Sequence, residues 1–510
     1  MREHSATMHS KRPTTFEFES SFEDLDATTC MTTLDYAAEA GDLDFVRTLL
    51  PICEDKAVTI GWKDLINRAA QSESEELVEY LLNYIPEAEL TALEKPEGHF
   101  NLWHTAAQNG MEGIIRWLIA SGKCYSLTLP SPLHAAIARG SEPIVSMFLN
   151  VGASIEERGN SCNDATSLYS PLYASVLAKD KSLVGLLLDW GADVNSKMRG
   201  GETALHVAAH LGLEDIAEFL VERGADLHAQ GVNHERPLDT ASRKGHKGMV
   251  ALLLRRGAKL THVTAEFSPL HAAVRETCAS KHIVKLLIEE GLEVNIRTTN
   301  GKTPLYLAVD HAPEDVIKLL IALGADPNIA SSGKTPLGSL LESAKKPPDA
   351  RTFRIIQLLG ERTDAKTKNS HLRTVVQGRG WYDYKPATRT GLVDALISIG
   401  ANVNTQYDGG KNLLFFIHHT FLDPTVKLLL ERGVNASAVD DGGNTVFHHF
   451  AKEYKKVKNA YPRANKLIFE DAVKLIAAAG ADLNAMNHNS ERAVDVLRAQ
   501  GIEIPPEGSI

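Results

Sequence analysis

The stretch GGETALHVAAHLGLEDIAEFLVERGADLHAQ, residues 200–230, is the most regular part of this chain. Leu205, Ala208 and Ala209 stand at i, i+3 and i+4, which predicts that they share one face of a short helix. A second amphipathic helix follows and ends before Gly224, because glycine adopts the left-handed conformation of a helix C-cap without steric penalty. One such pair has two apolar stripes that it cannot bury alone. The stretch therefore predicts similar pairs on both sides.

The chain repeats this pattern, most often at a spacing of 32 or 33 residues, which is typical of stacked helix pairs. The position of Leu205 recurs as Leu34, Ile66, Trp103, Leu133, Leu172, Leu238, Leu270, Leu305, Leu337, Leu372, Leu414, Phe447 and Val494. The glycine that ends the second helix recurs as Gly152, Gly191, Gly257, Gly291, Gly324, Gly400, Gly433 and Gly480.

Two short motifs recur along the chain. One is read in Ser131-Pro132-Leu133-His134, Ser268-Pro269-Leu270-His271 and Thr303-Pro304-Leu305-Tyr306, and the other in Gly191-Ala192-Asp193-Val194-Asn195 and Gly324-Ala325-Asp326-Pro327-Asn328. These motifs resemble those of the ankyrin repeat family, over about residues 31–500 and less clearly at both ends. The resemblance implies an all-α solenoid of about 13–14 helix-turn-helix units with short β-hairpin-like loops. It also implies a concave face, lined by the hairpins and first helices, that binds a protein.

The expected organisation is a flexible acidic-aromatic tail at residues 1–30, the solenoid at 31–500 and a C-terminal tail at 501–510. The first tail contains Phe16-Glu17-Phe18-Glu19, which either docks on a partner, covers the first repeat or frays in solvent. Insertions lengthen the repeat at residues 154–170, 343–354, 377–391 and 452–466.

The last three insertions carry formal charges of +3, +2 and +5, although the whole chain carries −11. Since insertions at equivalent positions of stacked units emerge on one side, they predict a basic edge interleaved with exposed aromatics. The candidate partner-binding residues are Arg379, Trp381, Tyr382, Tyr384, Lys385, Tyr454, Lys455, Lys456, Lys458, Tyr461 and Arg463. This edge is expected to dock an acidic partner, or an acidic segment of this chain or another copy. The alternative is a set of solvated loops whose aromatics lie flat on the solenoid.

The histidines His104, His134, His206 and His271 occupy the histidine position of the motif, where the ring ties neighbouring turns together. A zinc site at His418-His419 and His448-His449 is disfavoured, because no cysteine stands nearby and adjacent helical residues point apart. The chain lacks the usual phosphate-binding, dinucleotide-binding, hydrolase and zinc-protease motifs. We therefore expect no catalytic residue, metal or cofactor. The resemblance also implies that the hairpin residues Asn195, Asn328, Asn404 and Asn484 could be hydroxylated.

The five cysteines are scattered, no apolar run approaches the roughly 20 residues of a membrane helix, and no signal peptide is visible. These features favour an intracellular protein, cytoplasmic or nuclear, without membrane insertion. The acidic net charge disfavours a nucleic acid partner. The predicted function is a non-catalytic scaffold or adaptor for a protein partner. The alternatives are a regulatory accessory protein of an enzyme or biosynthetic pathway, a ubiquitin-ligase adaptor and a cryptic enzyme.

Overall fold

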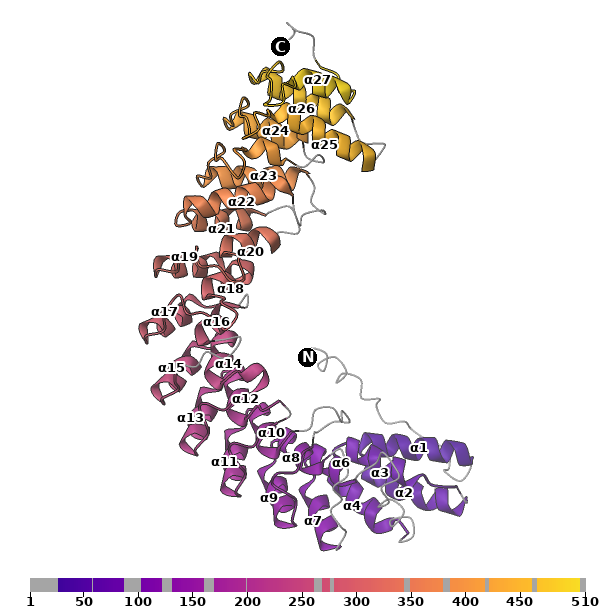
Figure 1. Ribbon diagram of the computed structural model, residues 1–510. Helices are drawn as coiled ribbons and strands as arrows, with labels where there is room; N and C mark the ends of the chain where they lie inside the picture. The colour runs from indigo at the N-terminus through magenta and orange to yellow at the C-terminus, as the bar shows by residue number, and fades with distance from the viewer. Residues whose placement is uncertain are drawn as a thin grey trace. The chain divides into compact units, whose positions relative to one another are not determined.

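The structure is a computed structural model that describes residues 26–56, 58–86, 102–121, 131–159, 169–198, 200–260, 268–275, 279–343, 349–378, 386–417, 422–460 and 466–504. Within these residues the chain forms 26 α-helices, which confirms the predicted all-helical repeat fold. The helices belong to two compact units. The first unit runs to Val232, and the second contains Asn233 onward together with Ala209–Gly212. Each unit is a row of paired helices (Figure 1).

Within each unit most first helices pack on the first helices of neighbouring pairs, and most second helices pack on neighbouring second helices. In the first unit the first helices are α1 (Ala27–Ala40), α3 (Trp62–Gln71), α6 (Leu102–Asn109), α8 (Pro132–Arg139), α10 (Pro171–Leu177) and α12 (Ala204–Leu211). The second helices are α2 (Leu43–Asp55), α4 (Glu75–Tyr84), α7 (Glu112–Ala120), α9 (Glu142–Asn150), α11 (Lys181–Asp189) and α13 (Glu214–Glu222).

The second unit continues the same plan after the 3-10 turn η2 (Val232–His234). Its first helices are α14 (Pro237–Lys244), α16 (Pro269–Arg275), α18 (Pro304–His311), α20 (Pro336–Ser343), α22 (Ala365–Gln377), the 3-10 turn η3 (Leu413–Phe416), α25 (Val446–Ala460) and α27 (Ala493–Ala499). Its second helices are α15 (Lys247–Arg255), α17 (Lys281–Glu289), α19 (Glu314–Ala322), α21 (Ala350–Gly360), α23 (Pro386–Ser398), α24 (Leu422–Glu431) and α26 (Lys466–Ala478).

The motif residues form these elements for local reasons. The hydroxyl of Thr303 caps α18 by accepting from the backbone N–H of Tyr306 at 3.2 Å, and Pro304 loses no hydrogen bond at the first helical position. All fourteen residues at the Leu205 position are buried, at 7% exposure or less. The glycines after the second helices have the predicted left-handed backbone, for example φ +91° at Gly224. The core therefore lies between pairs and within pairs along each row.

The flanking helices extend into three of the predicted insertions. The segments between those helices are therefore shorter than the insertions. In residues 343–354, Asp349 caps α21, and the helix begins at Ala350. In residues 377–391, α23 begins at Pro386. In residues 452–466, α25 continues to Ala460. At the N-terminus, Asp26 caps α1, so residues 27–30 belong to a helix and not to the expected tail.

In one repeat the histidine of the motif is replaced by a histidine of the next repeat. Gly338 stands where the motif has histidine, and the ring of His371, from the next repeat, lies against it. His371 Nε2 is 2.8 Å from the Thr335 hydroxyl. In the repeats that contain His134, His206, His271 and His448, the hydroxyl at this position contacts the histidine of its own repeat. Burial lowers the pKa of His371, which favours the neutral ring. The bond to Thr335 is kept, although the ring comes from a different repeat.

The contact between Gly338 and the His371 ring predicts that substitutions at these two residues have coupled effects on stability. A Cβ added at Gly338 would lie 2.7 Å from His371 Cε1, so Gly338→Ala is expected to lower the free energy of unfolding by about 1–3 kcal/mol. In the background of His371→Ala the clash is absent, and the same change should be neutral or stabilising by up to about 1 kcal/mol, since alanine favours a helix. Urea unfolding of the four proteins measures the coupling. If Gly338→Ala changed the free energy of unfolding equally in both backgrounds, the contact between Gly338 and His371 would be contradicted.

Candidate functional site

The motif histidines bridge successive repeats. The His271 Nδ1 accepts from the backbone N–H of Ser268 at 3.3 Å, so the proton of the neutral ring is on Nε2. Nε2 then donates to the Lys302 carbonyl of the next repeat at 3.0 Å. His448 makes the same contacts, with the N–H of Thr445 and the carbonyl of Glu491. His448, which the sequence placed in a possible zinc pair, is therefore a motif histidine with both nitrogens occupied.

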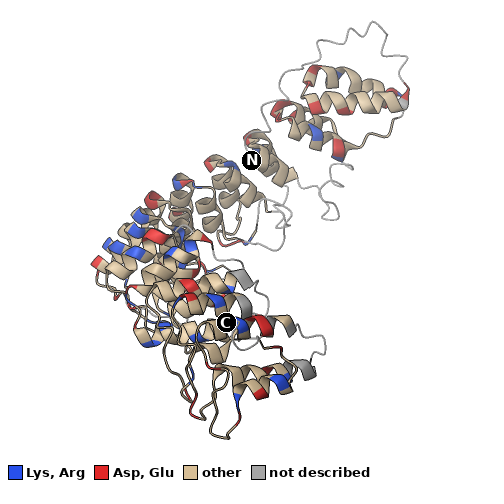
Figure 2. Cartoon of the chain, turned by 90° about the horizontal axis from the view of Figure 1, so that it is seen from above, with Lys and Arg blue, Asp and Glu red and all other residues tan. Residues whose placement is uncertain are grey.

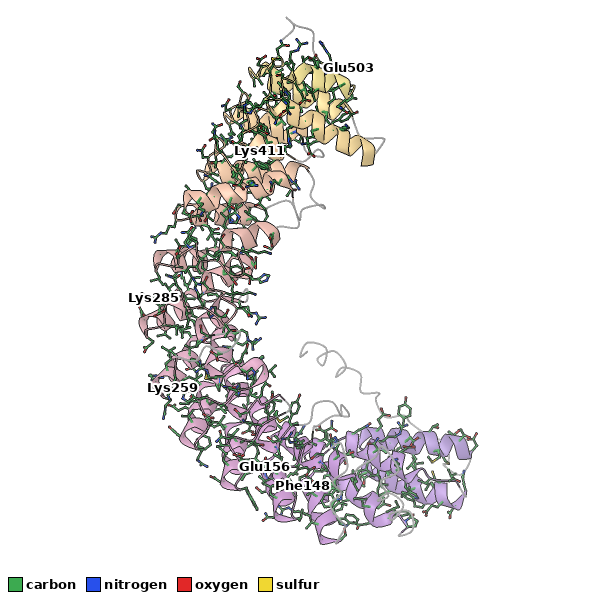
Figure 3. All side chains as sticks on the ribbon, viewed as in Figure 1. Phe148, Glu156, Lys259, Lys285, Lys411 and Glu503 are labelled. Atoms are coloured by element: carbon green, nitrogen blue, oxygen red, sulfur yellow. The ribbon has the colours of Figure 1, made fainter. Side chains whose placement is uncertain are left out.

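The hairpin asparagines form a second bridge between repeats. The Asn195 side chain donates to the Gly224 carbonyl at 3.2 Å and accepts from the N–H of Asp226 at 2.8 Å. Asn404 does the same with Gly433 and Asn435, at 2.9 and 2.7 Å. Both ends of each amide are thus used within the stack. In the first unit the hairpin residue Glu156, labelled in Figure 3, accepts from the backbone N–H of Asp193 in the next hairpin at 2.8 Å.

The predicted basic edge is partly described. Lys455 is exposed on α25, as is Lys452. Tyr454, expected to be an exposed aromatic, is instead buried at 5% exposure, and its ring packs edge-on against Phe469 at 4.9 Å. The expectation was wrong for Tyr454, because α25 continues through this residue and turns it toward α26. Lys456 and Lys458 lie in the same helix, and their side chains are outside the described part.

The remaining candidate residues, Arg379, Trp381, Tyr382, Tyr384, Lys385, Tyr461 and Arg463, lie outside the described residues, as do His418 and His419. Several basic residues of the three insertions serve the fold. Arg351 donates to the Ala312 carbonyl at 2.6 Å, and Arg354 pairs with Glu314 at 2.7 Å. Arg389 is 2% exposed, and burial lowers the pKa of its guanidinium to about 10. Within the described residues, Lys452 and Lys455 remain as exposed cations of the predicted edge.

A cation and two aromatic rings gather at the hairpin that carries Tyr407, in an arrangement that the motifs did not reveal. Arg373, at the histidine position of its repeat on α22, places its guanidinium 5.1 Å from the ring centre of Tyr407 and 4.5 Å from that of Phe416. The two rings meet edge to face at 5.5 Å. Tyr407 is fixed by a 2.8 Å hydrogen bond from its hydroxyl to the Asn369 carbonyl. Lys411, labelled in Figure 3, belongs to the same hairpin as Tyr407.

The three residues Arg373, Tyr407 and Phe416, here called the arginine cluster, are each only half-buried. Arginine and aromatic side chains in such a setting are the residues that most often dominate binding energy at protein interfaces. The burial of Tyr407 raises the pKa of its phenol to about 12, so the hydroxyl stays neutral. The sequence signal for this cluster is the departure of Arg373 from the histidine of its motif.

The described residues offer little for metal or nucleophilic chemistry. Among them, no group of three or more His, Cys, Asp or Glu side chains could hold a metal ion. Cys53 is buried, and burial together with the neighbouring Cys30 raises the pKa of its thiol to about 12. A thiol with so high a pKa is a poor nucleophile. Charged residues of both signs lie on the helices of both units (Figure 2).

The family follows from the repeat comparison. A family model described as "Ankyrin repeats (3 copies)" matches residues 34–128, 103–198, 172–264 and 241–331, which together cover more than half of the chain. The chain belongs to the ankyrin repeat family. Ankyrin repeats generally mediate protein–protein interactions, and the family is typically non-catalytic. Among the described residues, no helix is long and apolar enough to cross a membrane.

Individual relatives are distant. The mouse B-cell lymphoma 3 protein homolog is 26% identical over 241 residues, or 46% of this chain and 50% of that protein. Human ankyrin repeat domain-containing protein 63 is 30% identical over 22% of this chain and 31% of its own length. The solved ankyrin repeat domain of human ASB11 has a TM-score of 0.39 and 24% identity, and covers 45% of this chain and 100% of its own. The chain spans half or less of the curated relatives it matches.

The buried histidines predict a loss of stability in acid. Burial lowers the pKa of both His134 and His271 from 6.5 to about 4. The unfolded chain therefore takes up protons between pH 6.5 and 4 that the folded chain does not. Each histidine makes its full contribution to the free energy of unfolding above pH 6.5. As the pH falls toward 4, this contribution is lost, and the free energy of unfolding decreases by up to about 3 kcal/mol per histidine.

His271→Gln should reduce the fall in urea midpoint between pH 7 and pH 5, because one of these proton-binding differences is removed. The matched control is His282→Gln, since His282 is exposed on α17. An unchanged pH dependence in His271→Gln would show that this ring does not resist protonation in the fold.

Proposed function

We propose that the protein is a non-catalytic scaffold or adaptor that holds a protein partner against the hairpins, the first helices and the basic edge of its second unit. The observation that carries this proposal is the extension of α25. This helix has 15 residues, whereas the motif helices α8 and α16 have 8 and 7. The additional residues make about two more turns. Lys455 lies in this additional part and is exposed, and the exposed Lys452 precedes it in the same helix.

Physical reasons support a binding role for this extension. The buried Tyr454 anchors it to Phe469, so the exposed lysines stand on an ordered support. A positively charged, pre-ordered surface attracts an acidic partner and lowers the entropy lost on binding. In the second unit α20 packs on α18, and η3 packs on both α22 and α25. Because insertions at equivalent positions of stacked repeats emerge on one side, we expect the ends of α20 and α22 at the same edge as the end of α25. The candidate residues from Arg379 to Lys385 and from Tyr461 to Arg463 follow the ends of α22 and α25 in the sequence.

The test is quantitative capture of protein partners by the purified full chain. A variant with Lys452→Glu and Lys455→Glu should bind the captured partner about five- to tenfold more weakly, because two favourable charges become unfavourable. A second variant replaces only residues 379–385 with a Gly-Ser linker of equal length. That boundary leaves the buried Thr388 and Arg389 of α23 in place.

The matched control is Lys427→Glu, an exposed lysine on the second helix α24. This control should retain the partner, and all variants should keep the urea midpoint of the parent. Undiminished capture by both edge variants would end the proposal for this edge. Turnover of a substrate by the purified chain alone would contradict the non-catalytic part of it.

A further inference from the structure

The arginine cluster is arranged to receive a carboxylate. The guanidinium of Arg373 makes cation–π contacts with both aromatic rings, which restrict its movement. A guanidinium fixed in this way presents a planar fork of N–H donors that matches the two oxygens of a carboxylate. Its side chain is 31% exposed, so the fork remains accessible from solvent.

The present partner of that fork is a weak one. Arg373 Nη1 lies 3.7 Å from a carboxylate oxygen of Asp408, which is longer than a hydrogen bond. The Asp408 side chain is 99% exposed, and ion pairs at such exposed positions contribute little to stability. A carboxylate that approaches along the accessible side of the guanidinium can therefore replace Asp408 at little cost.

The surroundings of Arg373 favour an acidic ligand. The helix α22 has the sequence AKTKNSHLRTVVQ, which contains Lys366, Lys368 and Arg373 and no acidic residue. Lys366 is exposed, and Lys368 is half-buried. The exposed parts of the Tyr407 and Phe416 rings add an apolar surface beside this positive charge. The ligand that fits is an acidic segment with aromatic side chains.

The chain itself contains such a segment. Residues 13–46 have no lysine or arginine, and within them Phe16, Phe18 and Phe22 alternate with Glu17, Glu19, Glu23 and Asp24. This composition is complementary to the arginine cluster and to α22 in both charge and apolar character. We propose that residues 16–24 of a second copy of this chain bind the arginine cluster, with a glutamate on Arg373 and a phenylalanine against Tyr407 and Phe416. The proposal rests on the arginine cluster alone and does not depend on the basic edge or on an external partner.

The test uses a fluorescein-labelled peptide of residues 14–25, TTFEFESSFEDL, titrated with the full chain and followed by anisotropy. Saturable binding that weakens with added salt is expected. Arg373→Gln should weaken it about tenfold or more, because the fork is lost. The matched control is Arg362→Gln, which removes the same charge from an exposed position just before α22 and should change the Kd about twofold or less.

A charge exchange keeps the test independent of folding. Arg373→Glu should abolish binding of the parent peptide and regain binding of a peptide with Glu17→Lys and Glu19→Lys. Sedimentation velocity of the full chain should show concentration-dependent association that the same two glutamate substitutions reduce. The proposal is overturned if the peptide does not bind, binds Arg373→Gln equally, binds no better than a sequence-scrambled version, or binds while the full chain stays monomeric at every concentration. Each of these outcomes leaves the capture test of the basic edge unaffected.

Discussion

A pair of short helices has apolar side chains on both flanks, and in each unit of this chain the neighbouring pairs cover them. Leu270 and Ala273 of α16 are buried because α14 and α18 pack on either side of that helix. Small alanines let the first helices approach, and the left-handed glycines turn the chain toward the next pair. The stability of every pair therefore depends on its neighbours, as expected of a repeat protein.

This dependence accounts for the polar residues that recur from repeat to repeat. The motif histidines and hairpin asparagines look like functional groups when read in sequence, yet their polar atoms connect one repeat to the next. At Gly338, which lacks a side chain, the contact with the Thr335 hydroxyl is made by the His371 ring of the next repeat. Residues that differ from the motif do not make this connection, and Arg373 is one of them. The surfaces that we propose for binding therefore consist of residues that differ from the motif.

The repeat register could be predicted from the sequence because burial at one position, from Leu34 to Val494, recurs with a nearly constant period. The end of α25 and the start of α23 were harder to predict from the sequence. For α25 the reason is that the basic composition of residues 452–466 suggested a loop. The spacing of Phe447, Phe450, Ala451 and Tyr454 is helical and shows that the apolar face continues. The arginine cluster had no comparable signal, because Arg373, Tyr407 and Phe416 are brought together only by the stacking of successive repeats. A charge pattern alone does not show which cations are buried, as Arg389 is.

Hydrogen–deuterium exchange of the full chain, free and bound to a captured protein partner, separates stacking residues from binding residues most directly. If residues at motif positions stabilise the fold and residues that differ from the motif bind the partner, the amides of α8 and α16 should have the same exchange rates in the free and bound states. Added protection should fall at the end of α25, at the end of α22 and in the hairpin that carries Tyr407. Protection confined to second helices such as α9 and α15, with those three segments unchanged, would contradict this division of roles.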